Sequence, residues 1–159
     1  MLSYRHGFHA GNPADVFKHT VLLILIRAMQ AKPGGIRFLD THAGAGLYDL
    51  GSDIALKTRE FERGIARLWS REDLAESIAD YLTQVRGLNP DGRLRFYPGS
   101  PMLVRQLLRP QDRMILCELH PAEQAALADQ FAGDRQVTLH AGDGYGALER
   151  YLPPPGGRG

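Results

Sequence analysis

The stretch IRFLDTHAGAG, residues 36–46, joins an apolar run, an aspartate and a glycine-rich turn without interruption. A strand that delivers its carboxyl end to such a turn builds the ligand crevice of an open α/β sheet. Gly44 and Gly46 lack a Cβ, so the backbone can take positive φ there and a ligand can approach it closely. The turn has neither the third glycine of a GxGxxG loop nor the lysine of a P-loop. The leading ligand class is therefore an adenosine cofactor without phosphates, and a tight connection that binds nothing is the alternative.

The composition describes one ordinary globular domain of 159 residues, 43% hydrophobic and 23% charged. With a net charge of +1, a nucleic-acid site would have to be a local basic patch. The single cysteine, Cys117, lies in the apolar run RMILCEL and is expected to be a buried structural thiol. No run reaches the ~18 to 20 apolar residues of a membrane span, and the N-terminus lacks the order of a signal peptide. We expect a cytoplasmic protein that contacts no membrane.

Capping and turn signals divide the chain into helices and strands. Asn12, Pro13 and Asp15 mark a helix start, and the helix should run to about residue 30. Its apolar stripe is predicted to pack inward and consists of Ala14, Phe17, Val21, Ile24 and Ala28. Further helices are expected at 59–69, 74–86, 102–108, 121–131 and 145–152, and strands at 36–39, 114–118 and 137–140.

This order predicts an α/β fold with a parallel sheet covered by helices on both faces. Residues 1–47 and 96–159 would form the cofactor-binding domain, and residues 48–95 a helical insertion subdomain. The last predicted helix leads into PPPGGRG, although a βα unit should feed another parallel strand. Three strands alone would leave a long unpaired edge, so we expect C-terminal strands that this chain does not contain.

An acid follows each predicted strand of this sheet, namely Asp40, Glu118 and Asp143. A carboxylate after the second strand can accept hydrogen bonds from both ribose hydroxyls, and one after the third can accept from an adenine amino group. Together they suggest an adenosine pocket, whereas each acid alone could be a helix cap or a surface charge. Glu118 follows the glycine turn by far more than the ~20 residues of a dinucleotide fold, a gap that the insertion explains.

Two further regions carry polar groups with two possible interpretations. Ser100, in a Pro-Gly-Ser-Pro turn, could face the same crevice, but helix capping is the simpler interpretation from the residues alone. The N-terminal segment mixes aromatic and cationic side chains, which suits single-stranded nucleic acid but also a solvated terminus. It contains Tyr4, Arg5, His6, Phe8, His9, Lys18 and His19. The histidine spacing shows no zinc motif, so we expect no metal.

The chain resembles the bacterial 23S ribosomal RNA adenine-N6 methyltransferase J family in MLSYRHGFHAGNPADVFKH, LDTHAGAGLY, FYPGSP, ELHP and AGDGY. The resemblance implies a Rossmann-like methyltransferase domain that uses S-adenosyl-L-methionine to methylate N6 of one adenine in 23S ribosomal RNA. It implies an RNA contact from Tyr4, beside which we expect His6 and Lys18 of the same aromatic and cationic segment to bind RNA. It also implies a supporting role for Asp40 in the cofactor loop with Gly44 and Gly46. The cofactor contacts that it implies are His19, His42, Ser100, Glu118, Asp143 and Gly144.

One departure from the family matters for activity. Members continue into an apolar strand that ends in Asp-Pro-Pro-Tyr and carries the catalytic acid, and residues 1–159 contain no such motif. We therefore expect that the catalytic acid lies beyond Gly159 and that this chain contains no catalytic residue. We also expect inactivity when the chain is alone, and a monomer. The alternatives are a non-catalytic RNA-binding or interaction module of the same fold and, more distantly, a nicotinamide oxidoreductase.

Overall fold

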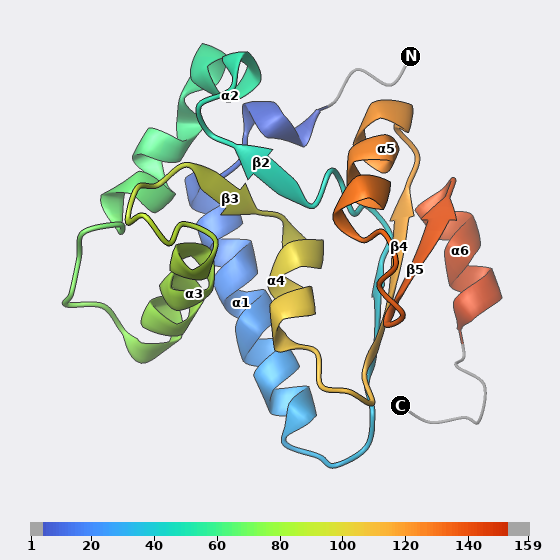
Figure 1. Ribbon diagram of the computed structural model, residues 1–159. Helices are drawn as coiled ribbons and strands as arrows, with labels where there is room; N and C mark the ends of the chain where they lie inside the picture. The colour runs from blue at the N-terminus through green and yellow to red at the C-terminus, as the bar shows by residue number, and fades with distance from the viewer. Residues whose placement is uncertain (1–4, 153–159) are drawn as a thin grey trace.

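The computed structural model describes residues 5–152, and three of its strands form a parallel sheet with the strand order β1-β4-β5 (Figure 1). The strands are β1 (Arg37–Asp40), β4 (Arg113–Glu118) and β5 (Val137–Ala141). Leu39 pairs with Ile115, and Cys117 with His140, so β4 is the central strand. All three predicted strands are confirmed, with ends that differ by one residue.

Helices cover both faces of β4, as its alternating side chains require. Met114 and Leu116 join the main core with α1 (Pro13–Gln30), α4 (Ser100–Leu107) and α5 (Pro121–Gln130). Ile115 and Cys117 point to the other face and pack under α6 (Gly144–Tyr151). Cys117 is fully buried, which confirms that it is a structural thiol. The predicted α/β fold class is therefore confirmed.

Helix α1 has the predicted ends but not the predicted buried face. The Asn12 side chain accepts a hydrogen bond from the Asp15 amide at 2.8 Å, and Pro13 is the first helical residue. The expected stripe is wrong, since Phe17 is 71% exposed and Ile24 49%. The face that packs inward consists of Asp15, His19, Thr20, Leu23 and Ile26. Polar residues interrupt this face, so the hydrophobic pattern indicated the wrong side of the helix.

The segment between β1 and α4 folds onto α1 and shares its core. It contains β2 (Leu47–Asp49), α2 (Asp53–Thr58), η2 (Glu60–Arg63), η3 (Ile65–Arg67), α3 (Glu76–Gly87) and β3 (Phe96–Pro98). Strands β2 and β3 pair antiparallel with Tyr48 opposite Tyr97, so the two ends of the segment lie side by side. This two-stranded ladder was not predicted. Another short helix, η1 (His6–Phe8), precedes α1.

The helix predicted over 59–69 is replaced by two short 3-10 turns. Arg59 adopts a left-handed conformation with φ 53°, which ends α2. At Gly64 the chain passes so close to the start of α1 that a Cβ would lie 2.1 Å from the Gly11 carbonyl oxygen. The Ile65 amide donates to that carbonyl at 2.9 Å. This contact between distant segments outweighs the local helical pattern.

Across residues 5–152, no helix is long and apolar enough to cross a membrane.

Candidate functional site

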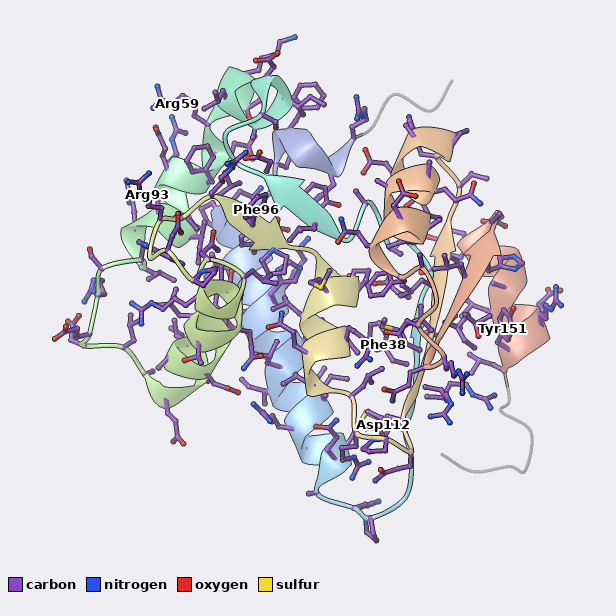
Figure 2. All side chains as sticks on the ribbon, viewed as in Figure 1. Phe38, Arg59, Arg93, Phe96, Asp112 and Tyr151 are labelled. Carbon is purple, nitrogen blue, oxygen red and sulfur yellow. The ribbon has the colours of Figure 1, made fainter. Side chains whose placement is uncertain are left out.

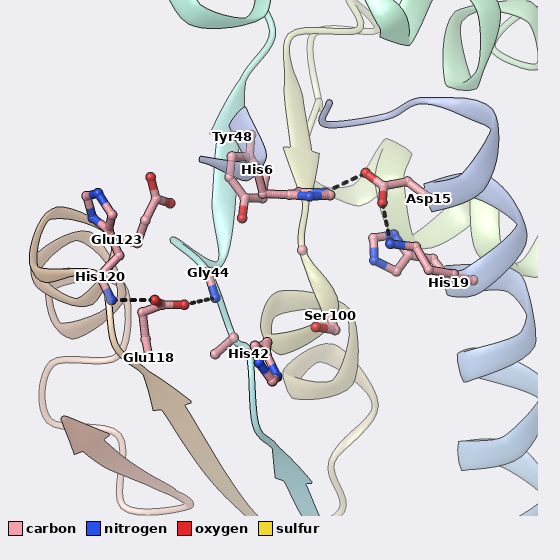
Figure 3. Close-up of a pocket in the computed structure, with 13 residues that line it drawn as sticks. His6, Asp15, His19, His42, Gly44, Tyr48, Ser100, Glu118, His120 and Glu123 are labelled. Atoms are coloured by element: carbon pink, nitrogen blue, oxygen red, sulfur yellow. Dashed lines mark hydrogen bonds and ion pairs between the residues drawn. The ribbon is translucent and has the colours of Figure 1, made fainter. Parts of the chain in front are cut away.

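A cavity of about 270 Å³ opens where β1 and β4 end, between the start of α1 and the start of α5 (Figure 3). The N-terminal segment, the glycine turn, β2 and the loops before α4 and α5 all contribute to it. Its lining residues are His6, Asp15, Lys18, His19, His42, Ala43, Gly44, Tyr48, Gly99, Ser100, Glu118, His120 and Glu123. The structure therefore brings seven predicted site residues together, namely His6, Lys18, His19, His42, Gly44, Ser100 and Glu118.

Glu118 at the end of β4 holds the glycine turn against the sheet. Its carboxylate accepts the Gly44 amide at 2.8 Å and the His120 amide at 2.7 Å, as Figure 3 shows. Gly44 and Gly46 have φ of 64° and 80°, which confirms the expected positive values. A carboxylate has about four lone-pair sites, so Glu118 can accept further hydrogen bonds from a ligand in the cavity.

Asp40 and Ser100 support this turn from the opposite side. The Asp40 carboxylate accepts the His42 amide at 3.0 Å and the Ser100 hydroxyl. Ser100 is the first residue of α4 and does not cap it, since Gly99 stands at the cap position without a side-chain bond. The simpler interpretation of Ser100 as a helix cap is thus wrong.

Asp143 and Gly144 lie beside the cavity rather than among its lining residues. Both carboxylate oxygens of Asp143 cap α6, accepting the amides of Tyr145 at 3.2 Å and Gly146 at 3.1 Å. The ring of Tyr145 meets that of His42 edge-on at 5.3 Å between centroids. The segment that follows β5 therefore contacts two lining residues of the cavity, His42 through the Tyr145 ring and Glu118 through a hydrogen bond from the Gly142 amide to its carbonyl oxygen at 3.1 Å.

The N-terminal segment is tied to α1 by Asp15, which is fully buried. The Asp15 carboxylate contacts His6 Nε2 at 2.8 Å, the Gly11 amide at 3.0 Å and Lys18 Nζ at 3.0 Å. Burial alone would raise the pKa of Asp15, but the hydrogen bond and charge of His6, with His19 and Lys18, lower it to about 2. His6 is thereby fixed at the cavity.

Two predictions concern the ends of the chain. Tyr4, the expected RNA contact, lies outside the described residues 5–152. Gly159, beyond which the catalytic acid is expected, also lies outside them. The RNA contact of Tyr4 and the position of the catalytic acid after Gly159 therefore stay predictions.

His19 enters the cavity from the buried face of α1. Its Nδ1 lies 2.9 Å from the Tyr97 hydroxyl, and its ring stacks on that of Tyr97 at 5.7 Å between centroids. Burial, assisted by the charges of Lys18 and His6 and opposed by Asp15, lowers the pKa of His19 to about 4. The imidazole is therefore neutral at pH 7.

Sequence reasoning missed four of the polar side chains that line this cavity. Asp15 was interpreted only as an acid at a helix start, and Tyr48, His120 and Glu123 were assigned no role. Glu123 Oε1 accepts a hydrogen bond from Arg5 at 3.2 Å. Glu123 Oε2 and His120 Nδ1 are buried without a hydrogen bond in the described part of the chain. The signal that could have found His120 is ELHP, since residues just after a strand line the crevice of such a sheet.

Within residues 5–152, no group of three histidine, cysteine or acidic side chains is placed to hold a metal ion.

A parallel sheet with helices on both faces, whose ligand cavity opens where β1 and β4 end, has the architecture of the Rossmann-like methyltransferases. The model of the family described as "Ribosomal RNA large subunit methyltransferase D, RlmJ" matches residues 34–159, and the chain belongs to this family. The resemblance inferred from the sequence motifs is thereby confirmed.

Two known relatives align with the whole of this chain. It is 47% identical over 159 residues to ribosomal RNA large subunit methyltransferase J of Escherichia coli (strain K12) and 46% identical over 160 residues to that of Haemophilus influenzae. Both alignments cover 100% of this chain and 57% of the relative. A crystal structure of a Legionella pneumophila protein superposes with a TM-score of 0.85 at 38% identity, covering 92% of this chain and 54% of that one. The chain thus spans somewhat more than half the length of its relatives.

Proposed function

We propose that the protein binds S-adenosyl-L-methionine in the cavity at the ends of β1 and β4. The observation that carries this proposal is Glu118, which faces the cavity while its carboxylate holds the Gly44 amide at 2.8 Å. An acid at this place can accept both ribose hydroxyls, and the turn beside it exposes backbone without a Cβ. The cavity volume of about 270 Å³ is slightly below the range of roughly 300 to 1,000 Å³ for small-molecule sites.

The other predicted cofactor contacts fit the same ligand. His19, His42 and Ser100 line the cavity and supply polar groups for the remainder of the molecule. Asp143 caps α6 with both oxygens, and its remaining lone pairs can accept a hydrogen bond from an adenine amino group. We propose that Asp143 and Gly144 meet the cofactor at the His42 side of the cavity.

The proposed reaction is methylation of N6 of an adenine in 23S ribosomal RNA. The family description and the names of both relatives refer to the RNA of the large ribosomal subunit. His6 and Lys18 line the cavity, and the cationic Lys18 side chain is 59% exposed, so it can meet a phosphate. The net charge of +1 agrees with a local rather than a global RNA-binding patch.

Bound S-adenosylmethionine would supply the electrophilic methyl group, while the protein would supply placement. The amino group of adenine is a weak nucleophile, so the reaction needs an acceptor for hydrogen bonds from that amine. The family motif that provides this acceptor, Asp-Pro-Pro-Tyr, does not occur in residues 1–159. We therefore propose that these residues alone bind the cofactor without transferring its methyl group.

Titration calorimetry with S-adenosylmethionine tests the cofactor site. We expect saturable binding to residues 1–159, weakened about 10- to 100-fold by Glu118→Gln, because a ligand hydroxyl loses a charged acceptor. Glu149→Gln, on the exposed side of α6, is the matched control and should bind as the parent does. Equal affinity of the Glu118→Gln variant and the parent would refute the assignment of the ribose site.

Methyl transfer is tested with labelled S-adenosylmethionine and unmodified 23S ribosomal RNA. We expect incorporation by a protein that includes Asp-Pro-Pro-Tyr and none by residues 1–159. Incorporation by residues 1–159 would refute the proposed inactivity. Binding of the RNA without transfer by the longer protein would instead favour the non-catalytic RNA-binding module.

A further inference from the structure

Two buried tyrosines connect the cavity to the insertion through His19. Tyr97, on β3, places its hydroxyl 2.9 Å from His19 Nδ1. Tyr81, on α3, places its hydroxyl 2.9 Å from that of Tyr97. Both tyrosines are 0% exposed and His19 is 6% exposed, so water does not supply alternative partners along this chain of contacts.

The number of hydrogens determines which group donates in each contact between His19, Tyr97 and Tyr81. There are two such contacts, and each tyrosine hydroxyl brings one hydrogen. Within residues 5–152, the Tyr81 hydroxyl has no hydrogen bond other than that to Tyr97. If His19 Nδ1 also carried a hydrogen, three hydrogens would compete for two contacts and one would be buried without an acceptor. An unsatisfied buried donor is costly, so this arrangement is disfavoured.

If His19 Nδ1 carries no hydrogen, both tyrosine hydroxyl hydrogens have an acceptor. Tyr81 donates to the Tyr97 oxygen, and Tyr97 donates to a bare Nδ1 of His19. A neutral imidazole carries one hydrogen, which must then be on Nε2. Since Tyr97 occupies Nδ1, the Nε2–H is the group that His19 can offer to a ligand in the cavity that it lines.

We infer that Tyr97, supported by Tyr81, is a positioning residue that fixes His19 in the Nε2–H tautomer and makes it a hydrogen-bond donor to the bound ligand. The matching ligand group is an acceptor such as a carboxylate. If the ligand is S-adenosylmethionine, this acceptor is its amino-acid carboxylate, and that identification rests on the proposed function. The tautomer itself follows from the protein alone.

The groups around His19 agree with this assignment. Burial lowers the pKa of His19 to about 4 despite the opposing charge of Asp15, so the ring is neutral near pH 7 and has a tautomer to fix. Lys18 and His6 lower the pKa further. A donor at Nε2 also suits a site that already contains the carboxylates of Glu118 and Glu123, because it offsets their repulsion of an anionic ligand group.

Long-range proton–nitrogen correlation NMR on the histidine-labelled protein tests the inference without any ligand. We expect the Nε2–H tautomer of His19 in the parent protein near pH 7. Tyr81→Phe should keep this tautomer, because Tyr97 still has one hydrogen to donate to Nδ1. Tyr97→Phe should give a mixture, because either tautomer then leaves a buried Nδ1 unpaired. Tyr151→Phe, on α6, is the control and should leave the His19 signals unchanged.

An Nδ1–H tautomer in the parent protein, or an unchanged tautomer in Tyr97→Phe, would overturn the inference. If Tyr97→Phe fails to fold, the parent and Tyr81→Phe spectra still decide it. In calorimetry, Tyr97→Phe should bind S-adenosylmethionine about three- to tenfold more weakly, and Tyr81→Phe less than about twofold. Failure of the parent to bind S-adenosylmethionine would refute the proposed function, and the NMR result would still decide the tautomer.

Discussion

The two ends of β4 each have a carboxylate, and the two carboxylates are held in different ways. Asp112, labelled in Figure 2 just before the strand, is fully buried. It accepts hydrogen bonds from Gln30, the Ile36 amide and the backbone and guanidinium of Arg109. Glu118, at the other end, is only partly buried and accepts two backbone amides. Only Glu118 keeps accepting capacity in a cavity.

Residues at the amino end of β4 therefore contribute to stability, and residues at its carboxyl end contribute to ligand binding. Arg109 also donates to the carbonyls of Gln30, Lys32 and Gly34, so Asp112 and Arg109 join the α1–β1 connection to the start of β4. The opposite end has a turn with positive φ and a cavity lined by titratable side chains. In an α/β sheet the carboxyl ends of the strands are the ends that bind ligands, and the amino ends can be optimised for packing alone.

The largest expected effect is at the amino end. Asp112→Asn should lower the free energy of unfolding by about 3 to 5 kcal/mol, because it leaves buried donors and the Arg109 charge without their anionic partner. Chemical denaturation measures this loss. Asp91→Asn, in an exposed turn, is the control and should change stability by less than about 0.5 kcal/mol. A loss below about 1 kcal/mol for Asp112→Asn would mean that this end of the sheet is not a main source of stability.

The pH dependence of stability should separate the two ends. The folded pKa of His19, about 4, is below its unfolded value, so the unfolded state binds the proton more readily. Stability should therefore fall by roughly 3 kcal/mol as pH decreases from about 6.5 to 4.

Burial alone would raise the pKa of Asp112, but its contacts with Arg109 and backbone amides outweigh burial and lower it. The contribution of Asp112 to stability is therefore present above about pH 4 and is lost below it. In denaturation experiments, the unfolding free energy of His19→Gln should depend less on pH than that of the parent only above pH 4. That of Asp112→Asn should depend less on pH than that of the parent only below pH 4. Identical profiles for the two variants would contradict this separation.

A smaller loss is expected in the glycine turn. Gly44→Ala would place a methyl group 2.3 Å from the Tyr48 hydroxyl at a residue with φ 64°, so we expect a loss of about 1 to 3 kcal/mol and weaker cofactor binding. Gly34→Ala has no heavy atom within 4 Å of the new Cβ and serves as the matched control. Equal stability of the two variants would show that the turn relaxes without cost.

The smallest effect on stability is expected from Glu118→Gln. A glutamine oxygen can still accept one of the two backbone amides, and water can accept from the other because the side chain is partly exposed, so the change in unfolding free energy should be below about 1 kcal/mol. Denaturation curves of this variant and of Asp112→Asn compare the two ends of β4 directly. A loss at Glu118 as large as that at Asp112 would remove the distinction between them.

The sequence predicts well the elements that local signals define. Asn12 and Pro13 fix the start of α1, and the acids that end β1 and β4 or follow β5 come after apolar runs that are readily recognised as strands. The ladder of β2 with β3 has no such signal, because each three-residue strand depends on its distant partner for hydrogen bonds.

The inward face of α1 is the most instructive error. Asp15 and His19 are buried there because the cavity and the N-terminal segment require polar groups, and this breaks the apolar period that predicts a core face. The contribution of Tyr81 and Tyr97 to the cavity is equally invisible in the sequence, since it depends on tertiary contacts between α1, α3 and β3.

The way the insertion packs on α1 has a consequence for protein engineering. A designer who seeks a minimal scaffold would excise residues 48–95 as an appendage between two halves of a Rossmann-like domain. That deletion would remove Tyr48 from the cavity wall and Tyr81 from behind Tyr97. It would also expose Leu23 and Ile26, which share a core with α3. The segment is therefore an integral part of the site, and a smaller version of this domain would need a new support for His19.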